Sequence, residues 1–192
     1  MSPATALDRL AERVREEGSP LAVGDGFGDP VFGELAGSGP RTRDRAAEYA
    51  LVVEAVREGY LCHYGSSRIL DDPDPDLALL AGDLFYAIGI RGLADLDDLE
   101  STGILSDLIR LAAELQAAGQ ADQAEALWIG QIVAFACGKD EHQSSLLAAL
   151  EAGEDGSVEA LSDWSRRIAT TNHLGREFDI AQTAIDSRPS NF

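Results

Sequence analysis

Three polar side chains on one stretch of the chain could bind or polarise a ligand. Tyr60, His63 and Tyr64 are spaced at i, i+3 and i+4, which places two phenols and an imidazole on one face of a helix. The same spacing is typical of a hydrogen-bonded edge of a helical core. The sequence therefore leaves two interpretations open, a ligand site and a structural edge.

Asp83 is the one charged residue in the most apolar stretch of the chain, Leu77 to Ile90. A carboxylate in such a stretch has to face solvent, a cavity or a partner, because burying it alone is unfavourable. We expect structural pairing or a polar edge of the helix. The expected partners are Arg57, Arg68 and the hydroxyl groups of Tyr60 and Tyr64.

Glycines interrupt the same apolar stretch. Gly82 and Gly89 are seven residues apart and share a helix face. A glycine inside a helix costs about 0.5–1 kcal/mol relative to alanine, so its repeated use indicates that a neighbouring backbone approaches closely. The alternative is that the missing side chains leave room for an elongated apolar ligand. Gly82, Gly89 and Asp83 therefore join the three aromatic residues as candidate ligand or core-polar positions.

A run of carboxylates, DDPDPD, precedes this stretch. Its members, Asp71, Asp72, Asp74 and Asp76, could bind Mg²⁺ through oxygen ligands and so position a diphosphate. Prolines break the run, and Asp is favoured at a helix start because it caps free amides and meets the positive end of the helix dipole. We expect capping, with no metal or other cofactor.

Charge limits the classes of partner. The chain has 192 residues, with 34 acidic against 15 basic side chains and a net charge of −19. Such a chain repels nucleic acid and anionic membrane surfaces at long range. The apolar stretch is shorter than the about 20 residues that span a bilayer, so we expect a buried core helix and no transmembrane segment. The N-terminus lacks the pattern of a secretory signal, which predicts a cytoplasmic protein with Cys62 and Cys137 as buried thiols.

Helix signals punctuate the chain from Thr42 onward, and no run alternates as a strand would. We predict an all-α bundle of six or seven mostly antiparallel helices. Residues 1–41 form an N-terminal helix and a Gly/Pro-rich arm, 42–172 the bundle, and 173–192 a tail with one weak helix. Apolar residues within 18–40 predict that the arm packs on the bundle, with a lid or a tether as alternatives.

One part of this bundle resembles a known family. The stretch Asp76–Ala87, DLALLAGDLFYA, resembles the helix of trans-polyprenyl diphosphate synthases that carries LLAGD followed by aromatic and small residues. Its flanking helices are also similar, and the likeness covers residues 49–118. It implies an isoprenoid-synthase-type bundle around a cavity for a prenyl chain. Active members hold Mg²⁺ and diphosphate on two DDxxD motifs. Here position 75 is Pro where the first motif needs Asp, and no second motif follows.

The chain therefore looks like the non-catalytic small subunit of two-component heptaprenyl-type synthases. This resemblance implies a homodimer, or a heterodimer with a helical partner such as a polyprenyl synthase catalytic chain. Two alternatives stay open. One is a structural or assembly protein with no ligand. The other is a divergent Mg²⁺-dependent prenyltransferase, although the missing motifs speak against an enzyme.

Overall fold

The protein is all-helical throughout the residues that the structure describes. The computed structural model describes residues 4–16 and 20–186, so the parts of the predicted N-terminal helix, arm and tail that fall at 1–3, 17–19 and 187–192 lie outside it. Within the described residues there are nine α-helices, one short 3-10 helix and no strand, with a single isolated bridge between Val23 and Leu70. The predicted all-α class is confirmed, and the predicted number of helices was too low.

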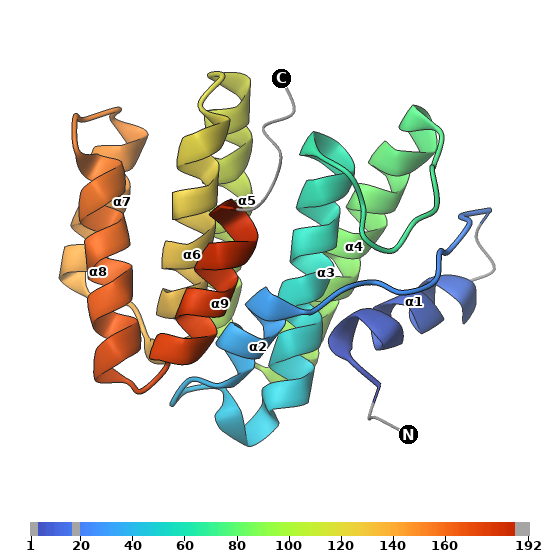
Figure 1. Cartoon of the computed structure of the whole chain (residues 1–192), viewed down its shortest axis with the longest axis horizontal. Coiled ribbons are helices and arrows are strands. Elements are labelled where there is room, and N and C mark those ends of the chain that lie inside the picture. Colours follow the sequence, from blue (N-terminus) through green and yellow to red (C-terminus); the bar gives the residue numbers. More distant parts are fainter. Residues whose placement is uncertain (1–3, 17–19, 187–192) are drawn as a thin grey trace.

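The helices are α1 (Ala6–Glu16), α2 (Val31–Gly37), the 3-10 helix η1 (Arg43–Arg45), α3 (Ala46–Tyr64), α4 (Pro75–Leu96), α5 (Leu99–Ala117), α6 (Ala121–Cys137), α7 (Glu141–Glu151), α8 (Ser157–Thr171) and α9 (Gly175–Asp186). After residue 40 the helices follow one another with short connections, except that residues 65–74 separate α3 from α4. In Figure 1, α3 and α4 stand beside each other with α1 across one side, and α5 to α9 form the other part, with α2 near the middle.

Helix α2 explains part of the miscount, because it lies inside the Gly/Pro-rich arm. Its glycines serve close approach to α3: a Cβ on Gly33 would lie 2.9 Å from the carbonyl oxygen of Ala50, and one on Gly37 would lie 2.8 Å from that of Ala46. Phe32 and Leu35 are buried. The arm therefore packs on the bundle, as the sequence predicted, through a helix that its composition concealed.

Aspartates begin three of the helices, and one of them, Asp74, belongs to the run that the sequence predicted to cap. Asp74 caps α4 by accepting a hydrogen bond from the Asp76 amide, and Pro75 occupies the first helical position. Asp98 accepts from the amide of Ser101 at the start of α5, and Asp140 accepts from that of Gln143 at the start of α7.

Helix α3 separates two hydrophobic clusters. Residues 51–62 of α3 are all buried. One side of the helix, including Val53, Val56 and Tyr60, packs into the larger core with α2 and α5 to α9. The other side, including Leu51 and Ala55, packs with α1, α4 and the segment that precedes α4. Helices α1, α2, α4 and α5 all contact α3 directly.

Small residues bring α3 and α4 together. A Cβ on Gly82 would lie 2.6 Å from His63 Nε2, and one on Gly89 would lie 2.6 Å from Val56 Cγ2. In the opposite direction, a Cβ on Gly59 would lie 2.6 Å from the Tyr86 ring. Side chains of the facing helix therefore fill the space that these glycines leave, which agrees with the close-packing interpretation.

Replacing one packed glycine should therefore destabilise the fold. We expect Gly89→Ala to lower the free energy of unfolding by about 1–3 kcal/mol, because the new methyl group overlaps Val56. Gly103→Ala on α5 is the matched control. Nothing lies within 4 Å of its added Cβ, so it should gain about 0.5–1 kcal/mol. Urea unfolding of both variants measures the difference, and equal effects would contradict the close approach of α3 and α4.

Candidate functional site

The predicted polar face of α3 has an inner and an outer end. Tyr60 points toward α5 and α6, and Tyr64 points toward solvent. The Tyr60 side chain is buried, and its hydroxyl accepts a hydrogen bond of 2.6 Å from Gln116 Nε2. Its ring centroid lies 5.3 Å from those of Tyr64 and Trp128. Tyr64 is 44% exposed. Tyr60 is thus tied into the core, and Tyr64 forms its outer edge.

His63, also on this face, contacts α4. Its ring stacks on that of Tyr86, with centroids 5.5 Å apart, and its Nε2 lies 3.3 Å from Asp83 Oδ1. The Asp83 side chain is 75% exposed. Asp83 therefore faces solvent beside His63, a contact that becomes an ion pair when the imidazole is protonated. The expected pairing of Asp83 with Arg57 or Arg68 was wrong. Arg57 binds Glu125 instead, and Arg68 binds the buried Glu54 and Glu58.

Groups that could act as nucleophiles are held in their neutral forms. Burial raises the pKa of the Cys62 thiol to about 12 and that of Cys137 to about 11. Burial, followed by the neighbouring Tyr64 and Tyr60, raises the pKa of Tyr86 above its ordinary value. Both cysteines are free thiols. These groups are therefore poor nucleophiles at neutral pH.

The acidic run lies at the solvent-exposed start of α4. Asp71, Asp72, Asp74 and Asp76 are all exposed, and Asp74 caps the helix. Among the described residues, no three His, Cys, Asp or Glu side chains are grouped closely enough to hold a metal ion. The geometry gives one member of the run, Asp74, a capping role.

A buried charge network on α3 escaped the sequence analysis. Glu54 and Glu58 are fully buried. Arg68 contacts both, with Nη2 2.5 Å from Glu54 Oε2 and Nε 2.6 Å from Glu58 Oε1. The amide of Gly33 donates to Glu54 Oε1 at 2.6 Å, and the hydroxyl of Ser67 donates to Glu58 Oε2 at 2.7 Å. Burial opposes the charge on Arg68, but the two carboxylates outweigh it and hold its pKa above the ordinary value.

Arg57, one turn along the same helix, is also fully buried. Its Nη2 donates to both carboxylate oxygens of Glu125 on α6, at 2.7 and 3.0 Å. Its guanidinium carbon lies over three rings, 4.7 Å from the centroid of Phe32, 5.1 Å from Tyr60 and 4.6 Å from Trp128. Cation–π contacts of this kind strengthen when water is excluded. Arg57 therefore joins α2, α3 and α6.

The outer side of α4 is apolar and exposed. Leu80 is 66% exposed and Leu79 is 47% exposed. Only 28% of the helix's most apolar 18-residue stretch is buried. Going along the helix, the residues that share this side are Leu79, Leu80, Asp83, Ala87, Ile90 and Ala94, and we call them the α4 face. The prediction of a buried core helix is therefore wrong for this side.

Composition alone could not reveal that exposure. An apolar stretch identifies a helix that avoids water on some side, but it does not say whether the same chain supplies the cover. Among the described helices, α4 alone is long and apolar enough to cross a membrane, a property that core helices also have. Asp83 is the one charged residue within the α4 face, and the exposed Arg91 lies beside this face.

Comparisons with protein-family models, with curated proteins and with solved structures found no match to this chain.

A signal for the missed network was present in the sequence. Glu54, Arg57 and Glu58 are spaced at i, i+3 and i+4 inside a stretch that is apolar on all sides. A helix that is apolar all round is buried, so charges within it require partners. What sequence could not supply was the identity of those partners, because Glu125 is 68 residues from Arg57.

Removing Arg68 should destabilise the protein strongly and in a pH-dependent way. We expect Arg68→Met to lower the free energy of unfolding by about 3–5 kcal/mol, because Glu54 and Glu58 remain buried without their counter-charge. Folded Arg68→Met protein then takes up protons more readily than its unfolded chain, so its stability rises as the pH falls. The deficit relative to wild type should therefore be smaller near about pH 5 than near about pH 7.5.

The matched control is Arg45→Met. Arg45 forms an ion pair of 4.0 Å with Glu48, and both side chains are about half exposed. Exposed pairs of this kind contribute less than about 1 kcal/mol. Urea unfolding at both pH values measures the two variants. If Arg68→Met fails to fold at neutral pH, Arg68→Lys, which keeps the charge, should fold with a smaller loss. Equal small losses for Arg68→Met and Arg45→Met would contradict the structural role of the network.

Proposed function

We propose that the protein is a non-catalytic binding partner that docks on another protein through the α4 face. The observation that carries this proposal is the exposure of Leu79 and Leu80, at 47% and 66%, on a helix that is apolar along most of its length. Contiguous exposed apolar surface on a water-exposed protein is typical of an interaction site. The spacing of the α4 face suits an α-helix or a helical pair as its occupant.

The charges around the α4 face favour a partner different from the protein itself. Asp76 and Asp95 lie exposed near the two ends of α4, and Asp83 lies within the face. The single basic residue of α4 is Arg91. The whole chain carries a net charge of −19. A second copy would bring like charges together, which opposes association. We therefore propose a heteromeric partner with an apolar helical surface and a basic rim.

The sequence resemblance suggests which class of partner to test first. The stretch that resembles polyprenyl diphosphate synthases includes most of α4, and the related small subunits act by pairing with a catalytic chain. We propose that such a catalytic chain is the occupant of the α4 face. The proposal does not include a prenyl chain between α3 and α4, because His63 and Val56 fill the space beside Gly82 and Gly89.

The test mixes the purified protein with the catalytic chain of a two-component polyprenyl diphosphate synthase from the same genome. We expect a monomer alone and a heteromeric complex in the mixture, measured by size-exclusion chromatography with light scattering. Leu80→Lys should weaken the complex about tenfold or more, because burying a leucine side chain contributes about 1.5–3 kcal/mol. The complex should also weaken as salt is raised.

Ile180→Lys is the matched control. Ile180 is 40% exposed on α9, which packs against α2, α6 and α8. This substitution should leave the complex unchanged. Three results would overturn the proposal: no complex with the catalytic chain, a complex equally weakened by both substitutions, or a homodimer of the protein that Leu80→Lys dissociates. Binding of the protein to lipid vesicles through Leu80, without binding of the catalytic chain, would also refute it.

A further inference from the structure

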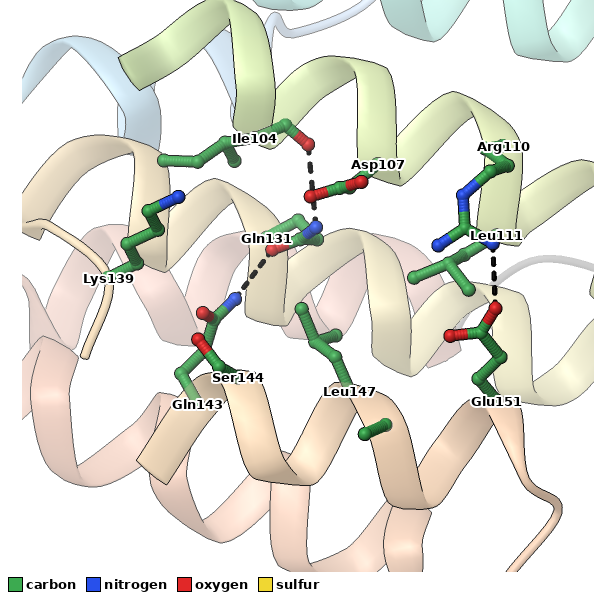
Figure 2. A pocket seen from close by; sticks show the side chains of 11 residues that line it. Ile104, Asp107, Arg110, Leu111, Gln131, Lys139, Gln143, Ser144, Leu147 and Glu151 are labelled. Atoms are coloured by element: carbon green, nitrogen blue, oxygen red, sulfur yellow. Dashed lines mark hydrogen bonds and ion pairs between the residues drawn. The ribbon is translucent and has the colours of Figure 1, made fainter. Parts of the chain in front are cut away.

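A polar pocket lies on the opposite part of the molecule from the α4 face. It is an open pocket of about 180 Å³ between α5 and α7, with Gln131 of α6 at its floor and Lys139 of the α6–α7 turn at one end. Figure 2 shows side chains from α5 and α7 facing each other across it. A cavity of about 150 Å³ holds a molecule the size of benzene, so this pocket suits a small metabolite and not an elongated chain.

The floor of the pocket is a pair of fixed amides. Gln131 and Gln143 are 1% and 2% exposed. Gln143 Nε2 donates to Gln131 Oε1 at 2.6 Å, and Gln131 Nε2 donates to the carbonyl oxygen of Ile104 at 3.4 Å. In Figure 2 the Gln143 oxygen points away from Gln131, on the side of Lys139, and it accepts no hydrogen bond from any described residue. The buried amides thus present an acceptor whose direction is fixed.

Two opposite charges line the same pocket. Lys139 is the only lysine of the chain, and neither it nor Asp107 belongs to an ion pair within the described residues. At the other end, Arg110 and Glu151 pair with each other at 2.8 Å. The four charges sum to zero in a protein whose net charge is −19. The pocket therefore disfavours a ligand with net charge and offers one free site for each sign.

The rest of the wall is aliphatic. Leu111 and Leu147 lie on α5 and α7, between the two charged ends. Small-molecule sites combine such an apolar wall with a few polar groups that fix orientation.

We infer that this pocket binds a small zwitterion, specifically an α-amino acid with an aliphatic side chain. Lys139 Nζ binds the carboxylate, Asp107 and the Gln143 amide oxygen bind the ammonium group, and the aliphatic wall receives the side chain. The inference is independent of docking through α4.

Isothermal titration calorimetry of the full chain with leucine tests this assignment. We expect saturable binding, and we expect 4-methylpentanoate, which lacks the amine, and isopentylamine, which lacks the carboxylate, to bind about tenfold more weakly or less. Lys139→Met and Asp107→Asn should each weaken leucine binding by a similar factor.

The control variants are Arg43→Met and Asp122→Asn, which alter exposed charges outside the pocket. They should bind leucine as the wild type does, with unchanged circular dichroism in all four variants. No saturable binding of leucine at about 10 mM would overturn the inference, because pockets of physiological use bind well below this concentration. Equal binding of leucine and its two analogues would overturn it too, as would equal binding by all variants.

Discussion

The structure depends on one constraint: α3 is buried along twelve consecutive residues, 51–62, and yet carries three charged side chains. A charge removed from water is tolerated only when it is paired and hydrogen-bonded. Glu54 and Glu58 share Arg68, and Arg57 binds Glu125 within three aromatic rings. The partners come from the chain before α3, from the segment after it and from α6. Pairing the buried charges of α3 therefore fixes the positions of α2, of the α3–α4 connection and of α6 together.

The burial of α3 also determines which apolar surface stays exposed. Once α2, α5 and α6 occupy one side of α3, and α1 and α4 the other, α4 is the outer layer of its half of the molecule (Figure 1). Its glycines face α3 and set α4 close against it, while Leu79 and Leu80 face outward. An apolar surface on α4 thus results from the way that α3 is packed. A partner that covered it would complete a layer that the chain itself leaves open.

Sequence reasoning succeeded where the signal is local. The proline and aspartate at the start of α4 act through neighbouring amides, and the predicted start was right. It failed where the answer depends on distant residues. Gly33 and Gly37 lie in the segment predicted as a Gly/Pro-rich arm, but in the fold they let a helix, α2, lie against α3. Asp83 pairs with His63 because the two arginines are bound elsewhere. The apolar pattern likewise predicted the helix α4, but it could not predict that one side of this helix is exposed.

The acidity of the protein has a structural distribution that bears on its function. Glu54 and Glu58 are internal and paired, and Asp74, Asp98 and Asp140 cap helices. Hydrogen bonds to Asp98 show the consequence: burial opposes its ionisation, but Ser101, Tyr49 and Arg41 outweigh burial and lower its pKa. Most of the remaining negative charge lies on the surface, where it hinders self-association around an exposed apolar helix and favours a partner of opposite charge.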